Sequence, residues 1–178
     1  MTWEKDFGGR KIRRTILIVF AVVLAWFSRA AAESNPVLLQ ALNEARQQEC
    51  TSKRRCEHHE DRFNLSIPYH QIIAEKEQVI AALTALIVGL GGTADAVAPA
   101  RSAQQRVLAA MAADARAQIE LISLYDRVLG EFGHPETRRV IAWAKNMALS
   151  HFLMLSVRSQ ELLDEQWLSR TGGSEQPQ

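Results

Sequence analysis

Apolar residues recur along four stretches of this chain at alternating spacings of three and four residues. The clearest stretch runs from Val107 to Leu129, and its stripe consists of Leu108, Met111, Ala115, Gln118, Ile122, Tyr125 and Leu129. A period of about 3.5 residues keeps one face of a helix against neighbouring helices. Gln118 is the polar exception at the midpoint, so the pattern predicts a buried helix that carries one polar group into the interior.

Three further stretches share this periodicity. The first is predicted to start at Pro36 behind a favourable N-cap, Asn35, and its stripe is Leu38, Leu42, Ala45, Glu49, Ser52, Cys56, His59 and Phe63. The second is predicted to open at Ser66, and its stripe is Ile72, Glu75, Val79, Ala82 and Leu86. The last follows Pro135, and its stripe is Val140, Ala144, Met147, His151 and Met154.

The segments between these stretches predict how the helices connect. Residues 93–99 form the longest connection, whereas residues 130–133 form a short turn. No stretch shows the two-residue period of a strand, and no repeat of fixed length occurs in the sequence. We therefore predict an all-α, up-down-up-down four-helix bundle over residues 33–170, followed by a disordered tail at residues 171–178.

The first 32 residues have the composition of a targeting signal. Five basic residues precede an apolar run from Ile16 to Phe27, and Ala30-Ala31-Ala32 follows it. A basic region, a short apolar region and small residues at a cleavage site are typical of a secretory signal peptide. The Arg13-Arg14 pair also resembles a twin-arginine export signal, although ordinary signal peptides carry such pairs too.

The location of the folded part follows from this segment. The apolar run is shorter than the roughly 20 residues of a membrane span, which favours cleavage after Ala32 over a retained inner-membrane anchor. In both cases the basic end stays in the cytoplasm. We therefore expect contact with the export machinery, and a bundle that is periplasmic or secreted, or anchored in the inner membrane facing the periplasm.

Charge excludes one class of partner for the mature chain. The full chain of 178 residues holds 21 Lys/Arg and 20 Asp/Glu. Residues 1–32 contain six of the former and two of the latter, so 15 basic and 18 acidic residues remain, a net charge of −3. A chain with this balance has no global electrostatic attraction to nucleic acid, and no nucleic-acid partner is expected.

Each predicted helix places one polar residue on its buried stripe near mid-length. These residues are Glu49, Glu75, Gln118 and His151, and Gln78 lies one turn beyond Glu75. In a four-helix bundle, mid-length positions fall at a similar height, so these side chains are expected to converge. Because unpartnered buried carboxylates are very costly, they must bond to one another, to water or to a metal ion.

The same positions carry a resemblance to a known family. Residues 117–127 are AQIELISLYDR, where the family pattern is EIANIALYDR, and further matches lie at residues 41–45 with Glu49, at 68–75 and around His151. On these residues the chain resembles the ferritin-like, rubrerythrin-related bacterial domains of unknown function. The resemblance extends from Pro36 to Leu163 and implies a ferritin-like bundle, which often pairs into a homodimer.

The family's di-metal centre takes Glu from two helices and Glu-x-x-His from the other two. This chain has Gln78 where the histidine would fall, Gln118 where a glutamate would fall, and Ala148 at a carboxylate position. The candidate ligands are therefore Glu49, Glu75, Gln78, Gln118 and His151. Two carboxylates are few for a pair of ions. We expect a degenerate, metal-free centre in a non-catalytic binding or scaffold protein, whose partner the sequence does not identify.

Two alternative functions use metal. In the first, Glu49, Glu75 and His151 bind iron or manganese in a ferritin-like oxidoreductase or metal-storage protein. In the second, Cys56, His58 and His59 form a copper- or zinc-handling cluster. On a continuous helix Cys50 and Cys56 would be rotated by about 240° and separated by about 9 Å along the axis, too far to form a disulfide with each other. Either the helix is broken between them, or the thiols remain free or pair between molecules, and we favour an unbroken helix.

The targeting signal gives a first test. Mature protein isolated from the cell envelope is expected to begin at Glu33, because signal peptidase cuts after small residues such as Ala30 and Ala32. Intact-mass measurement of that material checks the expectation. A chain that retains residues 1–32 there would favour the membrane anchor over the cleaved signal.

Overall fold

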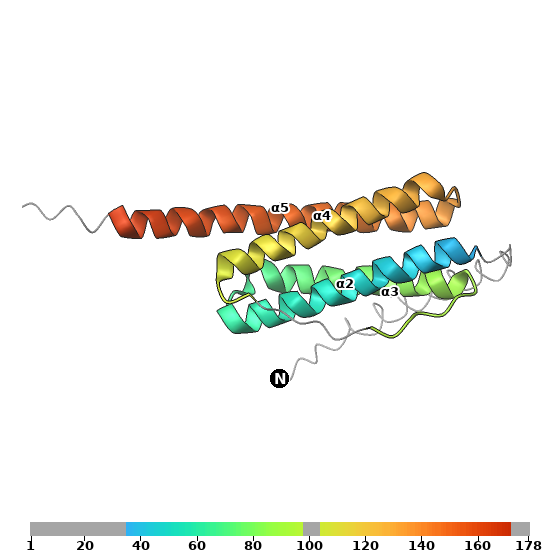
Figure 1. The fold of residues 1–178 in the computed structure, drawn as a ribbon, viewed down its shortest axis with the longest axis horizontal. Helices are drawn as coiled ribbons and strands as arrows, with labels where there is room; N and C mark the ends of the chain where they lie inside the picture. The colour runs from blue at the N-terminus through green and yellow to red at the C-terminus, as the bar shows by residue number, and fades with distance from the viewer. Residues whose placement is uncertain (1–34, 98–103, 172–178) are drawn as a thin grey trace, which may run out of the picture.

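The computed structural model describes residues 35–97 and 104–171 of the chain, and the side chains of residues 170 and 171 are not part of this description. All regular structure in these two ranges is helical (Figure 1). The elements are α2 (Pro36–Phe63), α3 (Ser66–Gly89), α4 (Val107–Glu131) and α5 (Pro135–Thr171). The all-α prediction is confirmed. The predicted signal segment at residues 1–32 lies outside the described residues, as does the predicted tail beyond Thr171.

The first helix begins as its sequence predicts. The Asn35 side chain accepts hydrogen bonds from the backbone N–H groups of Val37 and Leu38, at 3.0 and 3.2 Å. Pro36 takes the first helical position, where it has no N–H to leave unsatisfied. The helix ends at Asn64, whose left-handed backbone (φ 51°) lets its N–H bond back to the carbonyl of Glu60.

The helix directions differ from the predicted alternation. Two bonded pairs join α2 to α4, Glu49 with Tyr125 and His59 with Asp114. Residue numbers rise along α2 as they fall along α4, so these helices are antiparallel. The tight turn after Phe63 makes α3 antiparallel to α2 as well. Helices α3 and α4 therefore run in the same direction (Figure 1), and the up-down-up-down prediction is wrong.

The connection between α3 and α4 crosses back along the bundle. Its described part lies on α2, where Asn43 donates to the Thr93 carbonyl (3.1 Å) and accepts from the Asp95 N–H (3.0 Å). Arg46 donates to the Asp95 carbonyl at 2.8 Å. The segment thus passes from the end of α3 towards the start of α4, and it is a crossover and not a hairpin loop.

The predicted stripe is confirmed from Leu38 to His59 in α2 and only in part in the other helices. In α4, three of its positions are buried, Met111, Gln118 and Tyr125, whereas Leu108, Ala115, Ile122 and Leu129 are only partly buried. In α2 the buried residues are Leu38, Leu42, Ala45, Glu49, Ser52, Cys56 and His59. In α3, Ile72, Val79 and Leu86 are buried as predicted, but Lys76 and Leu83 are buried where Glu75 and Ala82 were expected. In α5, Ala144 and His151 are buried as predicted, whereas Ile141, Ala148 and Leu155 are buried in place of Val140, Met147 and Met154. The core therefore runs along all four helices, with polar side chains at its middle.

Helix α5 is the longest element and extends beyond one end of the bundle (Figure 1). Among the described residues it is the one helix whose length and composition would allow it to cross a membrane, with 28% of its apolar stretch buried in the bundle. Its inner face packs on α4 and α3, whereas its outer face exposes several large apolar side chains.

Candidate functional site

Every helix contributes polar side chains to the buried middle of the bundle. The buried polar or charged residues among those described are Glu49, Ser52, His59, Lys76, Asp114, Gln118, Thr137 and His151. Such groups must find partners inside the protein, since each unpaired one costs about 1–3 kcal/mol and an unpaired charge costs more. Apart from Thr137 at the start of α5, they form two networks and one pair.

The first network is built on a lysine, and we call it the lysine centre. It comprises Glu49, Ser52, Lys76, Gln118 and Tyr125. The Lys76 ammonium donates to Glu49 Oε2 at 2.6 Å and to Gln118 Oε1 at 3.2 Å. Tyr125 donates its hydroxyl proton to Glu49 Oε1 at 2.7 Å, and Gln118 Nε2 donates to Ser52 Oγ at 3.2 Å. Three helices are joined at this point.

The lysine centre is nearly neutral and closed to solvent. Lys76 is 0% exposed and Glu49 is 1% exposed. Both Glu49 oxygens accept a short hydrogen bond, so the desolvated carboxylate is compensated. The pKa of Tyr125 lies well above its ordinary value because of burial and because of the adjacent Glu49 carboxylate. Tyr125 therefore stays protonated and acts as a hydrogen-bond donor.

The second network is built on an aspartate, and we call it the aspartate centre. Asp114 Oδ2 contacts His59 Nδ1 at 2.7 Å and accepts from the Tyr69 hydroxyl at 3.0 Å. Arg55 Nε lies 3.6 Å from Asp114 Oδ1, and within the described structure neither atom has a hydrogen-bond partner. Burial, followed by the nearby Asp114 charge, raises the pKa of the Cys56 thiol to about 12. Cys56 is therefore an inert, protonated thiol.

A histidine–glutamate pair links α5 to α3. His151 Nε2 lies 2.9 Å from Glu75 Oε2, and in the described structure the buried Nδ1 atom has no hydrogen-bond partner. Burial lowers the pKa of His151, the positive charge of Lys76 lowers it further, and the bond to Glu75 opposes both effects. A neutral ring with its proton on Nε2 fits these surroundings, since it donates to Glu75.

The predicted site residues are divided between these groups. Glu49 and Gln118 meet at Lys76, and Glu75 meets His151, as separate sets of contacts. Gln78 is exposed on α3, so its inclusion in the site was wrong. It lies about 200° around the helix from Lys76 and faces solvent for that reason.

The helical pattern of the sequence did not predict the central residue, Lys76. A lysine between two glutamates is usually solvated, and its burial becomes favourable only where a carboxylate on another helix faces it. One signal was available, because the buried Glu49 on α2 required a positive partner. Asp114 lies one turn before Gln118, but it was not predicted as a site residue either. Its partners, His59 and Tyr69, lie on other helices.

The cysteine–histidine cluster does not come together. Cys56 and His59 are buried, whereas the His58 side chain is exposed, with its ring centroid 5.9 Å from that of His59. Both cysteines of the chain are free, as the continuous helix α2 predicts. Across residues 35–97 and 104–171, no three His, Cys, Asp or Glu side chains are placed to hold one metal ion. The described residues thus do not fit a di-metal centre, and Lys76 supplies the positive charge beside Glu49.

Comparison with models of protein families, with curated proteins and with solved structures finds no match to this chain. The fold and the buried groups themselves define the class of molecule. It is an all-α protein whose four described helices enclose a lysine–carboxylate core.

The lysine centre predicts a strong coupling between two residues. Replacing Lys76 by Met leaves a buried carboxylate with one partner lost, and we expect a loss of about 3–5 kcal/mol in the free energy of unfolding. Adding Glu49→Gln to Lys76→Met should recover about 1–3 kcal/mol, because the stranded charge is then removed. Urea unfolding of the single and double variants gives both quantities.

The matched control is Arg127→Met, which breaks the exposed ion pair with Glu44 on the surface of the same helices. That pair should contribute less than about 1 kcal/mol. If Lys76→Met costs no more than the control, or if the two central substitutions are additive, Lys76 does not compensate Glu49.

His151 predicts a pH dependence of stability. Its folded-state pKa lies below the ordinary value of 6.5, so as the pH falls below about 6.5 the unfolded chain takes up a proton that the folded chain resists. Stability contributed by neutral His151 is complete above that pH and is lost below it, at up to about 1.4 kcal/mol per pH unit. His151→Gln should flatten this slope between about pH 6.5 and 5.

Chemical unfolding at several pH values measures the slope. His70→Gln is the control, because His70 is 84% exposed at its side chain and its replacement should leave the slope unchanged. An equal slope in the parent and in His151→Gln would contradict the assignment.

Proposed function

We propose that this chain is an exported, ferritin-like four-helix bundle in which a lysine takes the place of the metal ion, and that it acts as a non-catalytic binding or scaffold protein. The observation that carries the proposal is the Lys76 ammonium, which lies 2.6 Å from Glu49 Oε2 at the buried middle of the bundle. A fixed cation at that point already compensates the carboxylate that a metal ion would need as a ligand.

The charge of the site supports this proposal. A pair of divalent ions requires several anionic ligands, and repulsion from an ammonium among them would oppose binding. Glu49 is neutralised by Lys76, Gln118 is a neutral amide, and the buried Ala148 offers no ligand atom. Tyr125 uses the remaining Glu49 oxygen. The groups are therefore matched to one another and leave no anionic excess for metal.

The chain topology supports the ferritin-like part of the proposal. In ferritin-like bundles, one long crossover connects two helices that follow each other in the chain and run in the same direction. Helices α3 and α4 run in the same direction, and residues 93–96 of their connection lie along α2. Export rests on the sequence of residues 1–32. A bundle of this kind, with its polar core closed, offers its surface and not its interior to a partner.

One observation favours a second candidate function, a protein that binds a single iron or manganese ion weakly. The His151 Nδ1 atom is buried without a hydrogen-bond partner in the described structure, and Glu75 is partly exposed beside the same ring. These two residues could share one ion with water ligands. This candidate predicts that His151→Gln abolishes metal binding, whereas the leading proposal predicts no stoichiometric binding to lose.

Metal analysis tests both functions. Protein isolated from its native compartment should contain far less than one iron or manganese ion per chain, and added metal should leave its Tm unchanged. A ligand at 100 times its Kd would add about 2.7 kcal/mol, which a thermal melt resolves readily. Lys76→Ala should behave differently, because removing the ammonium frees Glu49 and allows a divalent ion to recover part of the lost stability.

Arg127→Ala, which removes an exposed cation, is the control and should show no effect of metal. A parent protein that gains several degrees from stoichiometric iron or manganese would overturn the proposal that the centre is degenerate. Equal behaviour of Lys76→Ala and the control would show that Lys76 does not occupy a metal position.

A further inference from the structure

Helix α5 continues past the bundle that it helps to build. It has 37 residues, whereas α2, α3 and α4 have 28, 24 and 25. Its C-terminal part forms an overhang (Figure 1), on which Leu163, Trp167 and Leu168 are 47%, 63% and 61% exposed. Large apolar side chains that are exposed on a projecting helix are unfavourable in water. The overhang therefore calls for a partner surface.

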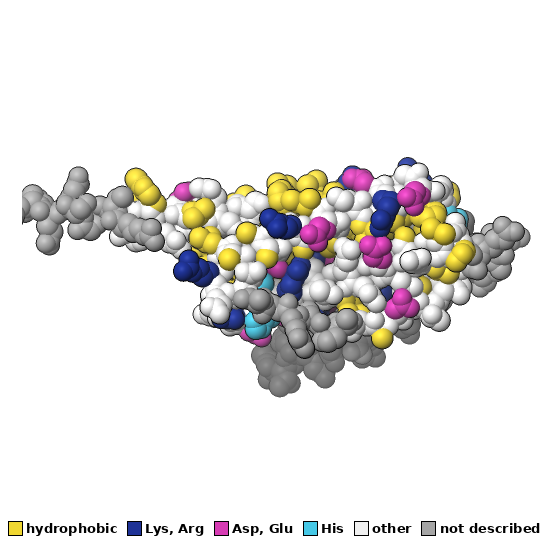
Figure 2. Space-filling model, viewed as in Figure 1, with side chains coloured by type: hydrophobic (Ala, Val, Ile, Leu, Met, Phe, Trp, Pro, Cys, Tyr) yellow, Lys and Arg dark blue, Asp and Glu magenta, His cyan; other side chains and the backbone are white. Residues whose placement is uncertain are grey.

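The part of α5 that lies on the bundle is also apolar on its outer face. Leu149, Leu153 and Val157 are 45%, 53% and 58% exposed, while Ala148 and Leu155 on the inner face are buried. Figure 2 shows hydrophobic side chains exposed both on the overhang and along the bundle. Two apolar faces explain why this one helix has the composition of a membrane span.

The outer face has the spacing of a helix-pairing seam. Steps of four and three residues give Leu149, Leu153, Ser156, Gln160, Leu163 and Trp167, which we call the α5 seam. This is the alternation of the a and d positions in a coiled coil, where each residue packs against a second helix. The inner face of α5 follows a different set of positions, so the seam is not part of the bundle's own packing.

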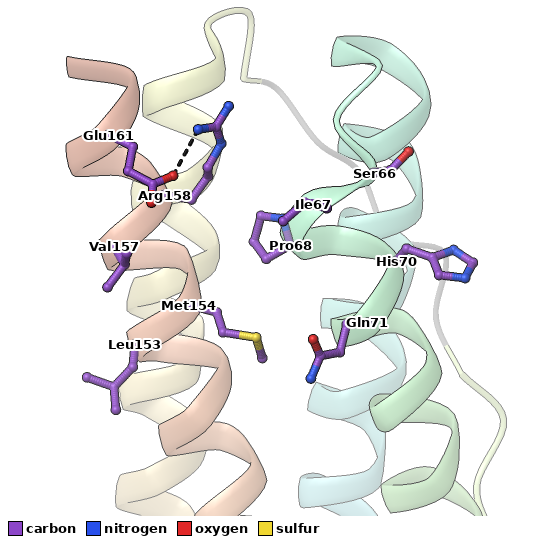
Figure 3. A pocket seen from close by; sticks show the side chains of 10 residues that line it. All are labelled: Ser66, Ile67, Pro68, His70, Gln71, Leu153, Met154, Val157, Arg158 and Glu161. Carbon is purple, nitrogen blue, oxygen red and sulfur yellow. Dashed lines mark hydrogen bonds and ion pairs between the residues drawn. The ribbon is translucent and has the colours of Figure 1, made fainter. Parts of the chain in front are cut away.

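A groove of about 610 Å³ borders the seam. It lies between α5 and the start of α3, and Figure 3 shows Leu153, Met154 and Val157 on one side and Ile67 and Pro68 on the other. Ile67 is 78% exposed, and the groove is lined mainly by apolar atoms. Where α5 lies on the bundle, the exposed apolar surface therefore includes the groove and Ile67 as well as the outer face of the helix.

We propose that the α5 seam pairs antiparallel with the α5 seam of a second copy of this chain. The order of residues along the seam is apolar, apolar, polar, polar, apolar, apolar. Such an order reads the same in both directions, so reversal of the partner helix matches every layer. Leu149 meets the second copy's Trp167, Leu153 meets its Leu163, and Ser156 meets its Gln160.

This arrangement has the two-fold symmetry of an isologous dimer. It places the overhang of each copy against the bundle-borne part of the other α5, so a single contact covers both exposed regions. The axis passes at the level of residue 158, midway between the Ser156 and Gln160 layers, and the neighbouring Val157 lines the groove. The polar Ser156–Gln160 layers at the centre fix the register, as a polar residue at an a position does in coiled coils.

The charges around the seam permit pairing between copies. From Leu149 to Trp167, the seam and the positions that flank it on a pairing helix hold one charged residue, Asp164. The charged Arg158 already pairs within the chain, with Glu161 at 2.9 Å and Glu165 at 3.3 Å. A lipid surface is a less suitable occupant, because Ser156, Gln160 and Asp164 interrupt the face that the lipid would contact.

Charge reversal tests the pairing and its register. Sedimentation velocity of the protein purified with its native N-terminus should give twice the chain mass at about 50 μM. Leu153→Lys and Leu163→Glu should each weaken the dimer by about 100-fold or more, because each buries two unpaired charges. The double variant should regain the dimer, since the lysine introduced into each copy then meets the glutamate introduced into the other copy.

Val88→Glu is the matched control, because Val88 on α3 is a 57% exposed apolar residue outside the seam and its replacement should leave the dimer intact. A monomeric parent at that concentration overturns the proposal, and so does a dimer that neither single substitution weakens. A double variant that stays monomeric while folded by circular dichroism excludes the antiparallel register. Binding to phosphatidylcholine–phosphatidylglycerol vesicles that Leu153→Lys abolishes, with a monomeric parent, assigns the face to lipid instead.

Discussion

The contact between Lys76 and Glu49 is the interaction on which the buried middle of this protein depends. Neither charge could be buried alone, since an unpaired ammonium or carboxylate in the interior costs several kcal/mol. Together, and with Tyr125 and Gln118 as further partners, they join α2, α3 and α4 at one height in the bundle. The same contact decides the chemistry of the centre, because a fixed cation beside Glu49 opposes the binding of a metal ion there.

Much of the fold follows from local sequence. The cap at Asn35 and the three–four spacing of α2 identify the buried face of that helix, Glu49 included, because both are properties of a single helix. The directions of the helices were not predictable in this way. Periodicity is unchanged when a helix is reversed, and the return of the connection along α2 depends on bonds from Asn43 and Arg46 to residues distant in the sequence.

The site was only partly predictable for a related reason. Glu49, Gln118 and His151 interrupt apolar stripes and can be found by their spacing. Lys76 lies one position from the predicted line of α3, a rotation of about 100°, and its burial depends on a carboxylate 27 residues earlier. Composition alone is also ambiguous for α5. A helix with two apolar faces has the composition of a membrane span even when one of its faces packs on its own bundle.

Nuclear magnetic resonance of the lysine side chains tests the central claim most directly. In ¹⁵N-labelled protein at neutral pH, one Nζ group should give a charged ammonium signal whose protons exchange slowly with water, since Lys76 is fully buried. That signal should show coupling across the hydrogen bond to the Glu49 carboxylate carbon and should vanish in Lys76→Arg. A Lys76 ammonium that exchanges as fast as the surface lysines, or a neutral amine at that position, would contradict the account.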